Sequence, residues 1–207
     1  GGAIFVPAGM SPSITNNFYW GNIAGSKKAP TMSIIMQEGE YEQKGGAIFT
    51  GGSGADPVIT GNEFKANEAP FGGAVAVIDT SHPIINNNKY IDNLGGLMDG
   101  NIHGVGGGLF VANTEIKVNE SDFVGNYALN GAGAAVVEKA NVEFKNNDFR
   151  WNVGDIDTSG TGKAGGIFGA GEGTGIIVGK PDSANNFYEN FSAFGGALAG
   201  VGSCTFT

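Results

Sequence analysis

Cysteine, histidine and arginine are almost absent from this sequence of 207 residues. The single cysteine, Cys204, excludes an internal disulfide, and its simplest interpretation is a small buried hydrophobic side chain on the last strand. The two histidines, His82 and His103, are far apart in sequence and have no repeated partner, so they do not indicate a catalytic pair. Arg150 is the only arginine, which is little for a lyase that would use Arg or Lys as its base.

Positive charge is scarce as well, with 11 Lys and Arg against 20 Asp and Glu and a formal net charge of −9. An acidic surface repels nucleic acid and anionic membranes, so neither is expected as a partner. No apolar run is long enough to span a bilayer, and the chain opens without a recognisable signal segment. We therefore expect no membrane-spanning segment in this chain.

Apolar residues at helical spacing are missing too, and the 38 glycines would penalise helices throughout. Short apolar runs take their place, for example at residues 58–60 and 115–118. Several of these runs alternate apolar with polar residues, which is the period of a strand with one buried face. Gly, Asn, Asp and Pro separate the runs and suit tight turns, so the pattern indicates many short strands.

One phrase recurs along the chain: an aromatic residue, an Asn three positions later, and then a Gly-Gly-Ala segment. It is clearest in residues 62–75, where Asn-x-Phe-x-x-Asn precedes Gly-Gly-Ala. The copies at 123–134 and 187–197 keep the same distance from the second Asn to the first Gly, and three further copies have longer spacers. A phrase repeated with fixed internal spacing predicts a stacked repeat.

We predict an all-β chain: a right-handed parallel β-helix (a β-solenoid) of about seven coils with three short strands in each, forming one domain over residues 1–207. Neighbouring coils of such a helix lie about 4.8 Å apart, so equivalent residues form files along its axis. The aromatic residues are expected to stack inside, and each Asn to bridge backbone groups at a turn. These predicted ladders consist of Tyr19, Phe64, Tyr90, Phe123, Phe149 and Phe187, and of Asn22, Asn67, Asn93, Asn126, Asn152 and Asn190.

The alternation of Gly-Gly-Ala-(Ile/Leu/Val) with Phe-x-x-Asn resembles the repeats of the polymorphic outer-membrane proteins of chlamydiae and of related repeat proteins. The resemblance covers essentially the whole chain, although Tyr19 and Tyr90 replace Phe and Gly131-Ala132-Gly133 replaces the double Gly. It implies a right-handed β-helix that is secreted or exposed at a cell surface. Several members of that family act as adhesins.

The longer spacers alternate with short ones, so we expect them to project from one corner of every second repeat. Loops on a rigid scaffold are where binding usually resides. We therefore predict a non-enzymatic extracellular or cell-surface β-helix for adhesion or surface recognition of a protein or glycan partner. The candidate recognition residues are Lys27, Lys28, Tyr41, Met98, Asp99, His103, Asp155, Asp157 and Lys163.

A structural subunit that stacks into a filament or sheath is the closest alternative function. Gly1 begins at full repeat register, and residues 199–207 stop partway through a coil. Neither end therefore has the pattern of a cap, and open ends of a β-helix invite pairing. We expect either a piece of a longer chain or copies that stack end to end.

Two further alternatives belong to other functional classes. A polysaccharide-active enzyme would need paired carboxylates, and candidates such as Asp92 with Asp99 lie in turn-like segments where acidic residues are usually only solvated. An ice-binding solenoid would need ranked threonines, but Thr15, Thr60, Thr114 and Thr158 form no regular Thr-x-Thr file.

No residue is assigned to catalysis, to a cofactor or to a metal. Asp155 and Asp157 could suit Ca²⁺ as oxygen ligands, but the nonapeptide of calcium-binding β-rolls is not repeated.

Overall fold

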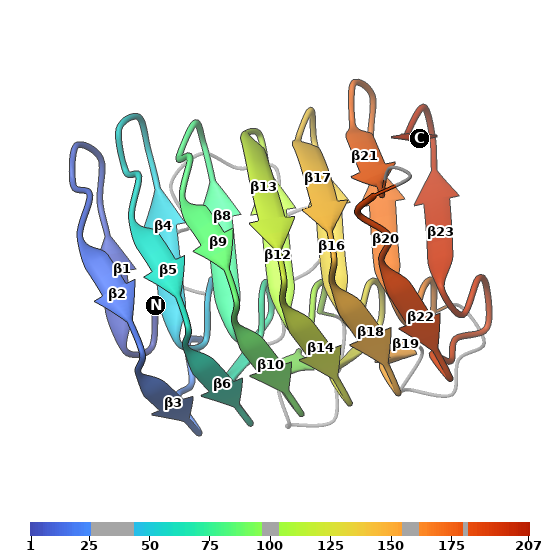
Figure 1. Cartoon of the computed structure of the whole chain (residues 1–207), viewed down its shortest axis with the longest axis horizontal. Helices are drawn as coiled ribbons and strands as arrows, with labels where there is room; N and C mark the ends of the chain where they lie inside the picture. Colours follow the sequence, from blue (N-terminus) through green and yellow to red (C-terminus); the bar gives the residue numbers. More distant parts are fainter. Residues whose placement is uncertain (26–43, 97–103, 155–161, 180–181) are drawn as a thin grey trace.

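The computed structural model describes residues 1–25, 44–96, 104–154, 162–179 and 182–207. Within these ranges the chain forms 24 short strands and no helix. The strands wind into successive coils that lie side by side along one axis, with the first coil at one end and the last at the other (Figure 1). This arrangement confirms the predicted parallel β-helix. The described residues include no helix that could cross a membrane.

Two parallel sheets of seven strands form the long sides of the helix. Sheet A has the order β1 (Ile4–Val6), β4 (Ile48–Gly51), β8 (Val75–Ile78), β12 (Leu109–Ala112), β16 (Ala134–Val137), β20 (Ile167–Ala170) and β23 (Leu198–Val201). Sheet B has the order β2 (Ser13–Thr15), β5 (Val58–Thr60), β9 (Ile84–Asn86), β13 (Glu115–Asn119), β17 (Asn141–Lys145), β21 (Gly175–Val178) and β24 (Thr205–Phe206).

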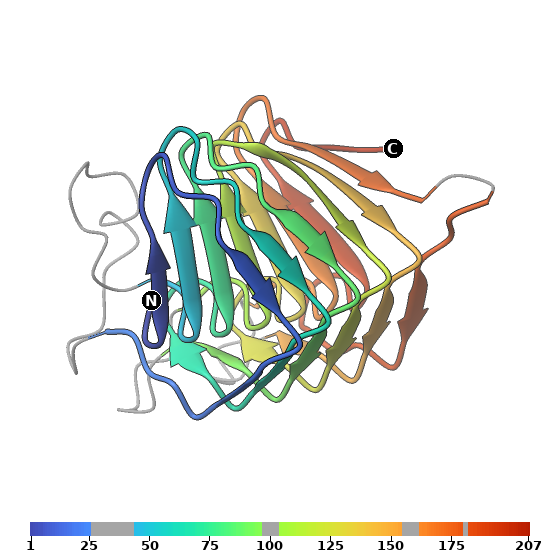
Figure 2. The same cartoon turned by 60° about the vertical axis from the view of Figure 1, so that its left-hand side comes forward.

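Two smaller sheets complete the coils. Sheet C has the order β22 (Asn186–Tyr188), β18 (Asp148–Arg150), β14 (Asp122–Val124), β10 (Lys89–Ile91), β6 (Glu63–Lys65) and β3 (Phe18–Trp20). Sheet D contains two-residue strands, in the order β19 (Val153–Gly154), β15 (Tyr127–Ala128), β11 (Leu94–Gly95) and β7 (Glu68–Ala69). Sheet D thus adds a fourth short strand to four coils, beyond the predicted three. Figure 2 shows how sheets A, B and C surround a common interior.

The interior is filled by the inward side chains of all three larger sheets, which form one hydrophobic cluster. Its spine is the predicted aromatic file: Tyr19, Phe64, Tyr90, Phe123, Phe149 and Phe187 are register partners on adjacent strands of sheet C. Successive ring centroids lie between 4.5 and 5.1 Å apart, and the rings are stacked. The predicted distance between coils therefore appears directly in the ring spacing.

A file of asparagines closes the turn from sheet C to sheet D. The backbone N–H and the side-chain amide of Asn126 both donate to Oδ1 of Asn152, at 3.0 and 2.9 Å. The same amide donates to the carbonyl of Tyr90, one coil back, at 2.9 Å. This pattern repeats at Asn67, Asn93 and Asn152. Because Asn126 and Asn152 are fully buried, these bonds satisfy polar groups that water cannot reach.

A second polar file lies at the turn from sheet B to sheet C and was not among the predicted ladders. Its members are bonded in the same way, with Ser121 in the place of Asn in one coil, and they are Asn17, Asn62, Asn88, Ser121, Asn147 and Asn185. Each precedes the stacked aromatic residue by two positions, as in the Asn-x-Phe-x-x-Asn phrase.

A second hydrophobic cluster covers the outer face of sheet A. Because side chains alternate along each strand, Ile48 points into the interior of the β-helix and Phe49 points outward. Leu109 and Phe110 alternate in the same way. The outward residues are buried as well: Phe49 is 2% exposed and Phe110 is 1% exposed. The buried part of this outward file consists of Phe49, Ala76, Phe110, Ala135 and Phe168, and the file continues to the exposed Phe5 in the first coil and to Ala199 in the last.

Candidate functional site

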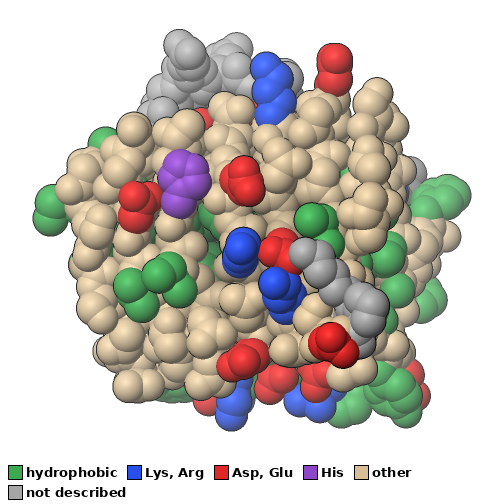
Figure 3. All heavy atoms as spheres, turned by 45° about the horizontal axis from the view of Figure 1, so that its top comes forward, with side chains coloured by type: hydrophobic (Ala, Val, Ile, Leu, Met, Phe, Trp, Pro, Cys, Tyr) green, Lys and Arg blue, Asp and Glu red, His purple; other side chains and the backbone are tan. Residues whose placement is uncertain are grey.

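Sheet B differs from sheet A because its outward side chains are polar or exposed. Strands β13 and β17 read Glu-Ile-Lys-Val-Asn and Asn-Val-Glu-Phe-Lys, and every second residue points outward. The register places Lys117 beside Glu143, with Ile84 next to Lys117 on the adjoining strand β9. Figure 3 shows charged side chains of both signs near the middle of the view. This outer face of sheet B is the candidate site.

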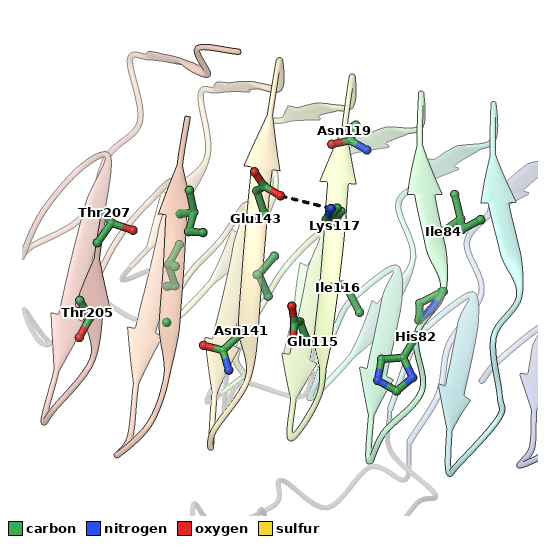
Figure 4. A pocket seen from close by; sticks show the side chains of 15 residues that line it. His82, Ile84, Glu115, Ile116, Lys117, Asn119, Asn141, Glu143, Thr205 and Thr207 are labelled. Carbon is green, nitrogen blue, oxygen red and sulfur yellow. Dashed lines mark ion pairs between the residues drawn. The ribbon is translucent and has the colours of Figure 1, made fainter. Parts of the chain in front are cut away.

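An open groove of about 700 Å³ runs across this face, over strands β9, β13, β17, β21 and β24. Its lining includes Ile84, Glu115, Lys117, Asn141 and Glu143, which Figure 4 shows on neighbouring strands. Ile177 and Thr205 line the groove on β21 and β24. Side chains of five successive coils therefore share one groove.

Gly175 helps to keep the groove open, because an outward position of β21 has no side chain. Its register partner on β17 is Asn141, whose carboxamide oxygen occupies the space that a Cβ at position 175 would need. Asn141 itself is exposed. The amide of Asn141 is thus available from the groove for a hydrogen bond with a ligand.

A carboxylate between two ammonium groups lies at the centre of the groove. Glu143 is 3.7 Å from Nζ of Lys117 and 3.1 Å from Nζ of Lys145. The Glu143 side chain is 11% exposed, whereas Lys117 is 66% and Lys145 32% exposed. The ammonium groups are therefore the part of this cluster that faces solvent. They form a small cationic spot on a chain with a formal charge of −9.

His82 closes one end of the groove, at the turn before β9. Its Nδ1 lies 3.6 Å from Oδ1 of Asp56, and its backbone N–H donates to the same oxygen at 2.8 Å. Both side chains are about half exposed, with values of 55% and 43%. The arrangement fits a surface turn in which Asp56 fixes the position of His82.

Groups suited to catalysis or metal binding are dispersed over the described ranges. Within them, no three His, Cys, Asp or Glu side chains form a group that could hold a metal ion. Arg150 lies on sheet C, away from the groove, with Nη2 3.9 Å from Asp122. Cys204 packs against the interior cluster, and burial raises the pKa of its thiol. Asp92, one of the paired-carboxylate candidates, lies at the exposed turn after β10.

Most of the predicted recognition residues fall outside the described ranges: Lys27, Lys28, Tyr41, Met98, Asp99, His103, Asp155 and Asp157. The remaining one, Lys163, pairs with Asn130 and Phe194 in a file at the corner before sheet A. Its Nζ lies 6.0 Å from the centre of the Phe194 ring. Lys163 is only partly exposed, and it lies at a different corner from the sheet B groove.

The threonines considered for an ice-binding face separate in the structure. Thr15 and Thr60 are register partners at the outer face of sheet B. Thr114 is instead buried, and its hydroxyl donates to the carbonyl of Ser81 at 2.6 Å. Thr158 lies outside the described ranges.

Sequence reasoning missed the groove residues Glu115, Lys117 and Glu143, and Lys145, which pairs with Glu143. The available signal was the strict alternation in 115–119 and 141–145, which places charges on one face of each strand. The register between the two strands, which brings Lys117 beside Glu143, could be derived only by aligning the coils.

Comparisons of the chain with protein-family models, with curated proteins and with solved structures gave no match.

Proposed function

We propose that this chain is a non-enzymatic recognition module of an extracellular or cell-surface protein, and that it binds its partner along the outer face of sheet B. The observation that carries the proposal is the open groove, which spans five successive coils and collects polar side chains from four of them. A groove of this length suits an extended ligand, such as a glycan chain or a peptide segment, better than a compact metabolite.

The scaffold supports a binding role because it holds the groove residues in fixed positions. Strands β9, β13, β17 and β21 are paired on both sides in sheet B, with β24 at its edge, and the polar files satisfy the turns that follow β13 and β17. A preformed surface binds without the entropic penalty of ordering loops. The partner would then meet side chains whose spacing follows that of the coils.

The charges favour a partner with an acidic group. Lys117 and Lys145 expose their ammonium groups on either side of Glu143, which is itself much less exposed. An incoming carboxylate or sulfate would pair with Lys117, and Asn141, the register partner of Glu115 on the adjoining strand, offers a hydrogen bond to the same ligand. Because the chain as a whole is acidic, an anionic ligand would be repelled elsewhere and attracted only near Lys117 and Lys145. This local attraction would fix where the ligand binds.

The direct test uses the fluorescently labelled whole chain on a printed array of acidic glycans, neutral glycans and acidic peptides. We expect saturable binding to acidic members, and a loss of about tenfold or more in Lys117→Ala combined with Lys145→Ala. The matched control is Lys65→Ala combined with Lys89→Ala, two lysines on the outer face of sheet C.

Two results would contradict the proposal. The first is array binding that is equally affected by the sheet B and sheet C variants, or no binding at all. The second is release of reducing ends or unsaturated products from a bound glycan, which would establish the enzyme alternative instead.

A further inference from the structure

Trp151 occupies a strained and exposed position at the corner between sheets C and D. Its φ angle is 57°, in the left-handed region that bulky side chains rarely adopt, and the side chain is 50% exposed. Backbone hydrogen bonds between coils stack this position on smaller or more flexible residues, namely Gly21, Ala66, Asp92, Gly125 and Glu189. All of these positions have positive φ, so the turn imposes this conformation in each coil, and Trp151 is the one aromatic residue among them.

The Trp151 ring is held in place from several sides. Its Nε1–H donates to Oε2 of Glu189, one coil further on, at 2.8 Å. The guanidinium carbon of Arg150 lies 5.8 Å from the ring centre. Gly125, one coil back, has no side chain that could cover the ring. The indole is thus fixed in an orientation that leaves half of its surface in solvent.

Other exposed aromatic residues lie near Trp151 on the same and neighbouring coils. Tyr188 is the register partner of Arg150 and is 59% exposed. Tyr127 and Phe191 are the two partners of Val153, and they are 39% and 63% exposed. We call Tyr127, Trp151, Tyr188 and Phe191 the aromatic corner. In Figure 1 it lies where β14, β18 and β22 end and the chain turns toward sheet D.

We propose that the aromatic corner is a second binding site, distinct from the sheet B groove, that takes the pyranose rings of a glycan chain. A pyranose has an apolar C–H face that packs on an aromatic ring and hydroxyl groups at its edge. Trp151 and Tyr188 supply exposed rings, and Glu189 and Arg150 supply an acceptor and donors beside them. Ring, carboxylate and guanidinium thus match the face and the edge of one sugar unit.

A protein partner fits this surface less well than a glycan. The core of a protein interface is depleted in charged residues, whereas Arg150 and Glu189 stand between the exposed rings here. An anionic membrane is disfavoured by Asp122, Asp148 and Glu189 on the same side of the molecule. Coils also repeat at about 4.8 Å, so a glycan that runs along the axis meets a new set of side chains at each coil.

The test follows tryptophan fluorescence in the whole chain carrying Trp20→Phe, which leaves Trp151 as the sole tryptophan of the original two. The probes are cellohexaose and chitohexaose, two neutral glycans that lack the acidic group expected to bind the sheet B groove. We expect a saturable change with at least one of them. Calorimetry with that probe should show binding at least about tenfold weaker in Trp151→Gly, and unchanged binding in Trp20→Phe and in Lys89→Ala, a lysine on the outer face of sheet C away from both proposed sites.

Trp151→Gly also separates a binding role from a structural one. Gly occupies the stacked positions 21 and 125 with positive φ, so this variant should fold and unfold at a higher temperature than the parent chain. The proposal is overturned if no probe binds, if binding survives Trp151→Gly, or if the variant unfolds at a lower temperature. It is also overturned if Trp151→Gly abolishes a dimer in sedimentation, because the occupant would then be a second copy.

Discussion

Sheets A and B have the same number of strands and the same parallel pairing, yet their outer faces are opposite in character. The outward file of sheet A is apolar, and it is buried from Phe49 to Phe168, with Phe110 at 1% exposure, while Phe5 in the first coil is 57% exposed. On sheet B the outward file presents Ile84 and Lys117, at 58% and 66% exposure. The two sheets share one interior, so the difference lies in what each offers to its surroundings. A sheet buried on both faces serves stability, and the one with a free face can serve binding.

The sequence records this difference in its periodicity. Strands β8, β12 and β16 read as unbroken apolar runs, as expected for strands buried on both faces. Strands β13 and β17 alternate, as expected for strands with one solvated face.

The largest expected effect compares outward residues of the two sheets. Phe110→Ala should lower the free energy of unfolding by about 3–5 kcal/mol, because it empties a buried site. Ile84→Ala should change it by no more than about 0.5 kcal/mol, because its side chain is already in water. Urea unfolding followed by circular dichroism measures both. Equal losses in the two variants would show that the two outer faces do not differ in this way.

Inward residues of the same two sheets should respond alike. Val111 in sheet A and Val118 in sheet B are both fully buried in the shared interior. Each change to Ala should destabilise the chain by about 2 kcal/mol, and the two losses should agree within about 1 kcal/mol. The same urea titration checks this prediction. A much smaller loss for Val118→Ala would place the difference between the sheets inside the helix as well.

A stabilising change is expected within the aromatic file that both sheets enclose. The Tyr90 hydroxyl is buried and has no hydrogen-bond partner among the described residues, and burial raises its pKa. Tyr90→Phe removes this unsatisfied group and keeps the stacking with Phe64 and Phe123, so stability should rise by about 1 kcal/mol. Phe123→Tyr is the reverse control and should destabilise. A loss of stability in Tyr90→Phe would reveal a partner for the hydroxyl.

The smallest expected effect is a pH dependence of stability that arises from Glu138, which lies at the turn between β16 of sheet A and β17 of sheet B. Burial raises the pKa of Glu138, Asp79 adds to the increase, and Lys44 opposes it. The folded chain therefore binds this proton more tightly than the unfolded chain, so the contribution is present at low pH and lost as pH rises through the raised pKa. Unfolding midpoints should be measured from about pH 4, near the ordinary pKa of Glu, up to about pH 7. The midpoint should fall slightly as pH rises over this range, and Glu138→Gln should remove the fall. An unchanged slope in the variant would exclude Glu138 as its source.

The files along the axis could be predicted from the sequence because stacking requires the same residue type in each coil. The spacing of Phe64, Phe123 and Phe187 from the following glycines identified the register without any structure. The polar file through Asn62 and Asn88 was present in the same phrase but was not recognised as a second ladder.

The candidate sites could not be predicted in the same way. Lys117 and Glu143 are 26 positions apart and resemble any solvated charges until the coils are aligned. The two-residue strands of sheet D, such as Glu68–Ala69, are too short to have a strand period. Trp151 stands out only when the coils are aligned, because the positions stacked on it in the described coils carry no aromatic ring.

Hydroxyl-radical footprinting of the intact chain, read residue by residue by mass spectrometry, tests the contrast between the two outer faces most directly. The structure predicts rapid oxidation of Ile84 on sheet B and strong protection of Phe49, Phe110 and Phe168 on sheet A, although aromatic rings are intrinsically the more reactive. Rapid oxidation of those three phenylalanines together with protection of Ile84 would contradict the assignment of sheet B as the open, binding face.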